Sequence, residues 1–292
     1  MGKISKAMEK SKDEFTHSFS SGKKSQKDQN KATFSKLNNR AVETIDSKNR
    51  TPRSKIRHSL NNQQPDRNLI SYHKPNSIEA EQFRVLKNKI LFPESGVPRR
   101  TIMVTSTSKG EGKSFVASNL STAIAYSIDE YVLLVDSDLR HPSVHTMFGI
   151  ENNEGLSTYL TNGVALSSLM VKTFIEKLTI LPGGPPPANP SELISSEQMR
   201  RLIREVESRY DDRYIILDAP PPYITSEANA LAKFVDGILL VVKQGHTRKD
   251  RLQDILEIYG REKVLGVVKN FAKGKFGLDY GYRYKYGYGN KR

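Results

Sequence analysis

The feature that most constrains the fold is a strand that runs through a glycine-containing loop into a helix. Residues 101–105 (TIMVT) form an apolar, β-branched run, the loop Thr107–Ser114 (TSKGEGKS) follows, and residues 113–126 have helical composition. The loop matches the P-loop pattern except that Thr107 replaces its first glycine. Because loop amides and a helix N-terminus can hold phosphate groups, the sequence predicts a phosphate-binding loop at this turn.

Further apolar runs alternate with helix-like segments along the chain. They are rich in β-branched residues and apolar on both faces, as parallel strands covered by helices are. We expect strands at residues 101–105, 131–136, 178–181, 214–218, 237–242 and 264–268, and helices at 113–126, 191–210, 226–234 and 248–259. This alternation predicts an α/β fold of the P-loop NTPase type, with a doubly wound, mostly parallel sheet whose ligands bind beyond the carboxyl ends of the strands.

Each part of the P-loop has an expected role in binding a nucleotide and Mg²⁺. Gly110 and Gly112 permit the turn of the backbone, Lys113 reaches the β- and γ-phosphate oxygens, and Ser114 ligates Mg²⁺. Asn270, at the end of the last strand, contacts a purine base or is a turn residue. The candidate nucleotide-binding residues are Thr107, Ser108, Lys109, Gly110, Glu111, Gly112, Lys113, Ser114, Phe115 and Asn270.

Acidic residues follow two other predicted strands. Asp136 and Asp138 end the segment YVLLVDSD, and Asp218 ends YIILD, where a Walker B carboxylate belongs. Carboxylates just past buried strands are costly unless a cation or substrate occupies the crevice, although each alone can cap a loop. Between them lies a proline-rich loop, residues 181–193 (LPGGPPPANPSEL), in which we expect Ser191 to cap the next helix.

The net charge of +14 is concentrated at the two ends of the chain. Residues 1–78 hold 17 Lys and Arg against 7 Asp and Glu, and residues 269–292 hold 7 against 1. Residues 79–268 hold 22 against 24, an ordinary near-neutral balance. The basic N-terminal region is rich in Ser, Lys, Asn and Gln and low in aliphatic residues, so we expect it to be largely disordered.

Three parts of the chain follow from this division. Residues 1–74 form the basic N-terminal region, in which Ile4, Met8 and Phe15 could line one side of a short docking or membrane-surface helix. Residues 75–270 form the P-loop domain, and residues 271–292 form a C-terminal tail. The absence of cysteine excludes disulfide scaffolds, thiolate metal sites and thiol nucleophiles. With neither a transmembrane run nor a signal peptide, we expect a cytoplasmic protein.

The C-terminal tail carries tyrosines on alternate positions. They are Tyr280, Tyr282, Tyr284, Tyr286 and Tyr288, five of the 13 tyrosines in the chain. An edge strand with one tyrosine face is one interpretation, but the interspersed glycines and the position at the chain end argue against it. Aromatic residues between Arg and Lys can also stack on nucleic-acid bases.

Taken together, these motifs resemble the bacterial tyrosine kinases (BY-kinases) of capsule and exopolysaccharide systems. The resemblance covers residues 75–292 and rests on a Walker A loop (SKGEGKS), a Walker A′ segment (LLVDSDLR), Walker B (IILDAPP), the GPPPANPSEL loop and the tyrosine cluster. The N-terminal region also looks like that of autokinases from exosortase-associated exopolysaccharide clusters.

The resemblance implies an ATP- and Mg²⁺-dependent tyrosine autokinase. Lys113 would hold ATP, Ser114, Asp138 and Asp218 would organise Mg²⁺ directly or through water, and Asp136 would accept the tyrosine hydroxyl proton, although Asp136 and Asp138 can exchange these roles. Arg140, in the same Walker A′ segment, is a further catalytic candidate. The five tail tyrosines would accept phosphate from a neighbouring subunit.

The resemblance also implies partners. BY-kinases work with a membrane-spanning co-polymerase or chain-length adaptor, so we expect an adaptor as activator, recruitment to the inner face of the membrane, and a tyrosine phosphatase that reverses the reaction. Family ring assembly uses a Glu-x-x-Arg-x-x-Arg helix, for which this chain has Glu81, Arg84 and Lys87. Acidic lipid is an alternative contact for the N-terminal region.

Two other classes of function compete with the kinase. Partition or positioning ATPases share the P-loop and the Asp-x-Asp pattern, but their signature lysine falls here on Ser108, with Lys109 one place off. A nucleic-acid-binding module would rest on overall charge alone, so we expect no specific nucleic acid partner.

Overall fold

The computed structural model describes residues 64–94, 96–209 and 212–272. Seven strands form one sheet in the order β3-β4-β2-β5-β1-β6-β7. The strands are β1 (Thr101–Ser106), β2 (Tyr131–Asp136), β3 (Val171–Lys172), β4 (Leu178–Leu181), β5 (Arg213–Asp218), β6 (Gly237–Lys243) and β7 (Val264–Asn270). All neighbouring pairs are parallel except β3 with β4. The expected doubly wound, mostly parallel sheet is confirmed.

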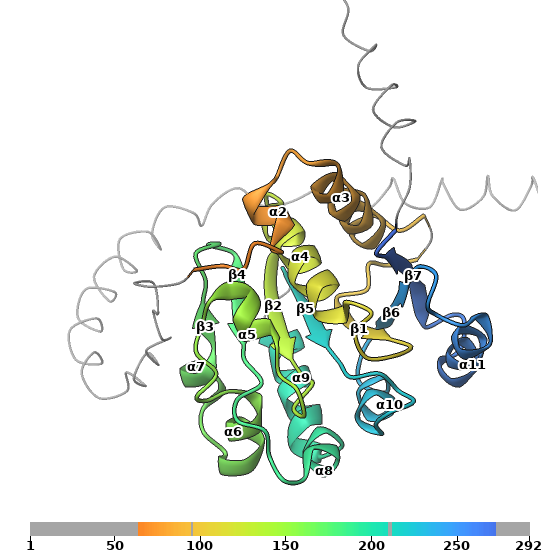
Figure 1. Ribbon diagram of the computed structural model, residues 1–292. Coiled ribbons are helices and arrows are strands. Elements are labelled where there is room, and N and C mark those ends of the chain that lie inside the picture. The colour runs from red at the N-terminus through yellow and green to blue at the C-terminus, as the bar shows by residue number, and fades with distance from the viewer. Residues whose placement is uncertain (1–63, 95, 210–211, 273–292) are drawn as a thin grey trace, which may run out of the picture. The chain divides into compact units, whose positions relative to one another are not determined.

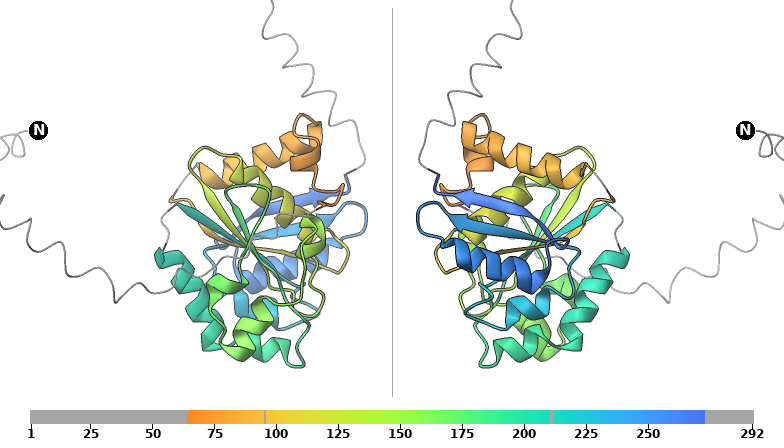
Figure 2. Two further views of the ribbon diagram at one scale, coloured as in Figure 1. Left: turned by 90° about the vertical axis from the view of Figure 1, so that its left-hand side faces the viewer. Right: turned by 90° about the vertical axis from the view of Figure 1, so that its right-hand side faces the viewer.

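Helices cover both faces of this sheet, as the two views of Figure 2 show. They are α2 (Ile70–His73), α3 (Ile78–Leu91), α4 (Lys113–Ala125), α5 (Val144–Phe148), α6 (Leu156–Asn162), α7 (Leu166–Leu169), α8 (Pro190–Ile194), α9 (Glu197–Arg209), α10 (Glu227–Leu231) and α11 (Lys249–Tyr259). Figure 1 shows α2, α3 and α4 together on one side of the sheet. Because successive strand residues point to opposite faces, each central strand contributes to two cores.

The two cores divide the strand residues by alternation. Ile102 and Val104 of β1 pack with residues of α3 and α4, whereas Met103 packs with residues of α9 and α10. On the core side of α3, Phe83 and Ile90 are buried and Leu86 packs against the same cluster. Both faces of the central strands are therefore buried, which explains their continuous apolar runs.

All six predicted strands are present within two residues of their expected ends. The two-residue strand β3 and the short helices α5, α6 and α7 were not predicted, because each is too short to show a hydrophobic period. The predicted helix 191–210 is two helices, α8 and α9. Ser191 does not cap α8, which begins at Pro190, and its hydroxyl accepts a hydrogen bond from Arg140.

The folded unit begins before the predicted boundary at residue 75. Leu69 is fully buried and packs in the core beside α4. Asn119 of α4 accepts a hydrogen bond from the Ser71 amide at 2.9 Å and donates one to the Asn68 carbonyl at 3.0 Å. A single buried leucine in a polar segment leaves no periodic signal, so local pattern does not assign Leu69 to the P-loop domain.

Within the described residues, no helix is both long enough and apolar enough to cross a membrane. The tail tyrosines and most of the basic N-terminal region lie outside the described residues, so the predictions made for them stay predictions.

Candidate active site

The P-loop joins β1 to α4 at the carboxyl edge of the sheet. Gly110 and Gly112 have φ values of 80° and 90°, in the left-handed region that favours glycine. A Cβ atom on Gly112 would overlap the side-chain Nδ2 of Asn270, so a side chain here would displace Asn270 from the Glu111 carbonyl to which it donates. The turn places Lys113 and Ser114 at the first residues of α4.

Three carboxylates lie next to Lys113. Asp136 and Asp218 are direct register partners at the ends of β2 and β5, and Asp138 follows two residues after Asp136. The Lys113 Nζ lies 2.9 Å from Asp138 Oδ2 and 3.9 Å from Asp218 Oδ1. Burial disfavours the charged ammonium, but the charges of Asp218 and Asp138 outweigh it and hold the pKa of Lys113 above its usual value.

Asp136 is fully buried and has one oxygen fixed and one free. Its Oδ2 accepts hydrogen bonds from the amides of Ser143 at 2.8 Å and Val144 at 2.9 Å, while its Oδ1 has no hydrogen-bond partner. Burial and repulsion from Asp218 raise the pKa of Asp136 to about 8, against the opposing effect of the two amides. Burial also raises the pKa of Asp218.

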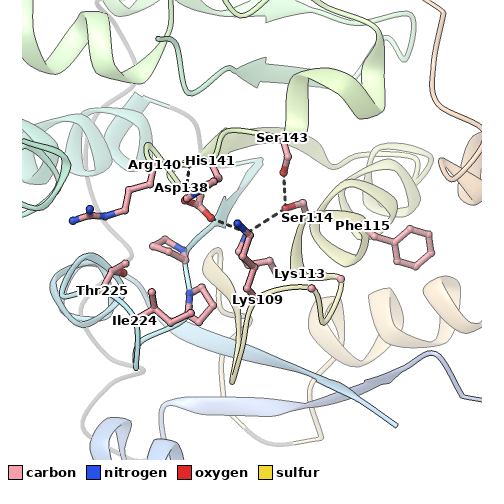
Figure 3. Close-up of a pocket in the computed structure, with 14 residues that line it drawn as sticks. Lys109, Lys113, Ser114, Phe115, Asp138, Arg140, His141, Ser143, Ile224 and Thr225 are labelled. Carbon is pink, nitrogen blue, oxygen red and sulfur yellow. Dashed lines mark hydrogen bonds and ion pairs between the residues drawn. The ribbon is translucent and has the colours of Figure 1, made fainter. Parts of the chain in front are cut away.

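A cavity of about 330 Å³ opens beside these groups. Its lining includes Lys109, Gly110, Gly112, Lys113, Ser114, Phe115, Asp138, Arg140, His141, Ser143, Pro220, Pro221, Ile224 and Thr225. Figure 3 shows the Lys113 ammonium between Asp138 and the Ser114 hydroxyl, with Arg140 directed away from them. Asp136 and Asp218 lie beneath this lining rather than in it.

Arg140 is held by two side chains from distant parts of the chain. Its Nε donates to Glu227 Oε1 at 2.8 Å, and its Nη2 donates to the Ser191 hydroxyl at 3.1 Å. Glu227 is buried at the start of α10. The ion pair therefore fixes the Walker A′ segment against α10, and the hydrogen bond to Ser191 fixes it against the proline-rich loop.

The residues around Ser114 fit a Mg²⁺ ion that also binds phosphate. The Ser114 hydroxyl lies 2.9 Å from the Ser143 hydroxyl, and both Asp218 oxygens and one Asp136 oxygen are buried without a hydrogen-bond partner. Among the described residues, no three acidic or histidine side chains converge closely enough to hold a metal by themselves. Mg²⁺ commonly takes one or two protein ligands, with water and substrate phosphates completing its shell.

The structure thus brings together most of the predicted site. Lys109, Gly110, Gly112, Lys113, Ser114, Phe115, Asp138 and Arg140 line the cavity, with Asp136 and Asp218 beneath it. Phe115 points away from Lys113 in Figure 3, and its ring packs against the Phe83 ring, with the two ring centroids 5.7 Å apart.

Four predicted residues do not line the cavity but hydrogen-bond within the P-loop or to its backbone: Thr107, Ser108, Glu111 and Asn270. The Thr107 hydroxyl and the Ser108 amide both donate to the Glu111 carboxylate, at 2.9 Å. The Asn270 side chain donates to the Glu111 carbonyl at 3.0 Å, so Asn270 contacts the P-loop backbone, and its contact with a purine base stays a prediction.

The ring-assembly candidates lie on the exposed side of α3. Arg84 pairs with Glu81 at 2.6 Å and donates to the Pro75 carbonyl at 2.7 Å. Lys87 lies one turn further along the same helix. Their role in assembly stays a prediction.

Several residues of the site were not predicted from sequence. His141 directly follows the Walker A′ motif, and Pro220 and Pro221 follow Walker B, so position in the motif could have indicated them. Ser143 and Glu227 carry no local signal, because their roles depend on partners far away in the sequence.

Comparison with known proteins assigns the family. Residues 98–276 match a family model described as ParA: NUBPL iron-transfer P-loop NTPase. The tyrosine-protein kinase YwqD of Bacillus subtilis is 35% identical over 218 residues, which cover 74% of this chain and 91% of that protein. The putative tyrosine-protein kinase CapB of Staphylococcus aureus is 32% identical over 224 residues, 76% of this chain and 95% of that protein. This chain belongs to the bacterial tyrosine kinases.

Solved structures agree with this assignment. The kinase resembles the chimerical protein CapA2B2 with a TM-score of 0.65 and 34% identity, over 72% of this chain and 92% of that one. It resembles the kinase domain of the Escherichia coli tyrosine kinase ETK with a TM-score of 0.64 and 27% identity, over 71% of this chain and 83% of that one. A ParA family ATPase from Chlorobium tepidum shares the fold, with a TM-score of 0.50 and 20% identity over 64% of this chain and 80% of that one. The chain is therefore a protein-tyrosine kinase with a P-loop NTPase fold.

Proposed function

We propose that this kinase uses ATP and Mg²⁺ to phosphorylate the tyrosine cluster at its own C-terminus, between subunits, and so regulates exopolysaccharide or capsule biosynthesis. The observation that carries the proposal is the cavity in which Lys113 and Ser114 of the P-loop meet Asp138, above Asp136 and Asp218. A P-loop beside buried carboxylates is an arrangement with which P-loop enzymes bind Mg²⁺ and nucleotide phosphates for phosphoryl transfer.

Phosphate binding begins with a change of partner for Lys113. In the structure its charge is balanced by Asp138 and Asp218. The phosphates of ATP compete for this ammonium, while the amides of the P-loop and the N-terminus of α4 hold their other oxygens. Ser114 and Asp218, with Asp138, would hold Mg²⁺, and bound Mg²⁺ neutralises charge on the β- and γ-phosphates.

Asp136 is the proposed acceptor of the tyrosine proton. Its free Oδ1 is oriented by the two amides on Oδ2. With a pKa of about 8, a minority of the Asp136 groups are ionised at neutral pH, and this ionised form is the proposed base. The tyrosine oxygen forms a bond to the γ-phosphorus, the bond to the ADP oxygen breaks, and the phenolic proton passes to the Asp136 carboxylate.

The proposed acceptors and partners are supported by the sequence and by the relatives. Five tyrosines at 280–288 in a basic tail are suited to an acidic site on a neighbouring subunit. Salmonella typhi carries a tyrosine-protein kinase, Wzc, that is 30% identical to this chain over 31% of its own length. We propose that a membrane-spanning co-polymerase adaptor activates the kinase at the inner face of the membrane, that a tyrosine phosphatase reverses the reaction, and that Glu81, Arg84 and Lys87 support ring assembly.

Intact-mass and phosphopeptide analysis tests the proposal. The full chain is incubated with ATP, Mg²⁺ and an adaptor tail, and compared with Lys113→Met. We expect phosphotyrosine at positions 280–288 in the wild type and none in the variant. ATP binding without any tail phosphotyrosine, with the adaptor tail present, would exclude the tail as substrate.

A further inference from the structure

The Glu111 side chain belongs to the P-loop but is turned away from the cavity. It is 4% exposed, and the cavity lining includes its neighbours Gly110 and Gly112 but not Glu111 itself. Its carboxylate accepts the Thr107 hydroxyl at 2.9 Å, the Ser108 amide at 2.9 Å, and the hydroxyl of Thr247. Three donors thus converge on one buried carboxylate.

All three donors are electrically neutral. In the part of the chain that the structure describes, neither Lys nor Arg forms an ion pair with Glu111. A buried carboxylate without a cation is costly unless its oxygens are hydrogen-bonded, and such charge-assisted hydrogen bonds are short and directional. The arrangement therefore fixes positions rather than balancing charge.

Through Thr247 the carboxylate reaches a second segment, the turn between β6 and α11. The Thr247 hydroxyl also accepts the Lys243 amide at 2.9 Å, at the end of β6. Arg251, in the first turn of α11, donates to the Ser108 hydroxyl at 3.1 Å. Two independent contacts thus join the β6–α11 turn and the start of α11 to the P-loop. Thr247 and Glu111 are 136 residues apart in the sequence.

We propose that Glu111 is a positioning residue that ties the P-loop to the β6–α11 turn through Thr247 and holds the loop in its phosphate-binding conformation. The proposal also accounts for the threonine at the first position of the P-loop, because the Thr107 hydroxyl supplies one of the three donors. It rests on the proposed function only in that a nucleotide is the ligand of the loop.

The negative charge of Glu111 and its positioning role predict opposite effects of its removal on nucleotide affinity. A carboxylate next to a polyphosphate site repels the ligand, so removing its charge should tighten nucleotide binding if electrostatics were all that mattered. If Glu111 holds the loop in shape, removing it loosens the loop and weakens binding. The direction of the change in affinity therefore separates the two.

The test is the dissociation constant of ADP with Mg²⁺, measured by calorimetry on the full chain, with melting temperature and phosphorylation kinetics beside it. The variants are Glu111→Ala, Glu111→Gln, Thr247→Val and Thr247→Ser, with Glu257→Gln on the exposed side of α11 as the matched control. We expect Kd to rise about tenfold in Glu111→Ala, which corresponds to about 1.4 kcal/mol, and less in Glu111→Gln. Thr247→Val should weaken binding severalfold, and Thr247→Ser and the control should match the wild type.

Unchanged or tighter ADP binding in folded Glu111 variants would overturn the proposal. If Glu111→Ala does not fold, the Thr247→Val and Thr247→Ser pair decides, since only the first removes the hydroxyl. Equal affinities for that pair would count against the proposal. A wild type that does not bind ADP would refute the proposed function instead, and the Lys113→Met chain serves as the reference for lost phosphate contact.

Discussion

At the scale of single residues, the burial of Asp136 makes its protonation depend on folding. It is fully buried, one of its oxygens has no partner, and its pKa is raised to about 8. In an unfolded chain an aspartate titrates near pH 3.9. Between about pH 4 and pH 8, the folded protein therefore keeps a proton on Asp136, whereas the unfolded chain has already lost it.

This difference predicts how stability depends on pH. Protonated Asp136 favours the folded state at low pH, and this contribution is lost as the pH rises toward 8, with a slope of at most about 1.4 kcal/mol per pH unit. Asp136→Asn cannot ionise, so its melting temperature should exceed that of the wild type at pH 8–9, and the two should converge near pH 4. The exposed Asp129→Asn is the control. A difference between variant and wild type that does not vary with pH would contradict the assignment.

Gly112 predicts a second effect at this scale. Alanine there would adopt a φ of 90° and place its Cβ 2.1 Å from the Asn270 amide nitrogen. Gly163→Ala is a matched control, because Gly163 has a φ of 65° and no atom within 4 Å of the added Cβ. We expect a cost of about 1–2 kcal/mol in the control and a further 1–3 kcal/mol in Gly112→Ala, measured by denaturant unfolding. Adding Asn270→Ala should recover part of that further cost, and no recovery would exclude the clash as its cause.

At the scale of elements, the segment around α2 shows what a boundary drawn from composition overlooks. Leu69 is fully buried against the core beside α4, and Asn119 of α4 hydrogen-bonds on both sides of it. A chain that begins at residue 75 should be less stable than one that begins at residue 64. Leu69→Ala should cost about 2–4 kcal/mol, and the exposed Arg67→Ala should cost little. Equal stability of the two truncated chains would show that α2 does not support the fold.

Four of the six predicted strands share one physical property. β1, β2, β5 and β6 are buried on both faces, and burial on both faces leaves an unbroken apolar run in the sequence. β3 is two residues long and pairs antiparallel at the edge of the sheet, so it leaves no such run. Periodicity could not reveal elements of this length.

In the candidate site, the residues inside motifs were predicted, and the contacts between distant segments were not. Lys113, Ser114 and the three aspartates were predicted because each lies inside a contiguous motif at the end of a strand. The pairs that organise the motifs are separated by 136 residues for Glu111 with Thr247 and by 87 for Arg140 with Glu227. Only the folded chain brings such pairs together, so local patterns cannot indicate them.

At the scale of the whole molecule, the distribution of charge predicts how phosphorylation acts on assembly. Residues 269–292 carry a net charge of +6 beside a domain that is nearly neutral. Each phosphotyrosine adds about −1.5 to −2 charges, so five add about −7.5 to −10 and reverse the sign of the tail. If the tail is the substrate, as proposed, the acidic site around Asp138 and Asp218 should attract the unphosphorylated tail and repel the phosphorylated one.

We therefore expect heavily phosphorylated chains to leave the neighbouring subunit and the assembly to dissociate. Light scattering before and after phosphatase treatment measures this: phosphatase should increase the molar mass of the particle severalfold. A chain with all five tail tyrosines changed to phenylalanine is the control, and its size should not respond to ATP or to phosphatase. A phosphorylated wild type that keeps its size at physiological salt would show that contacts other than the tail, such as those of Glu81 and Arg84 on α3, are sufficient for assembly.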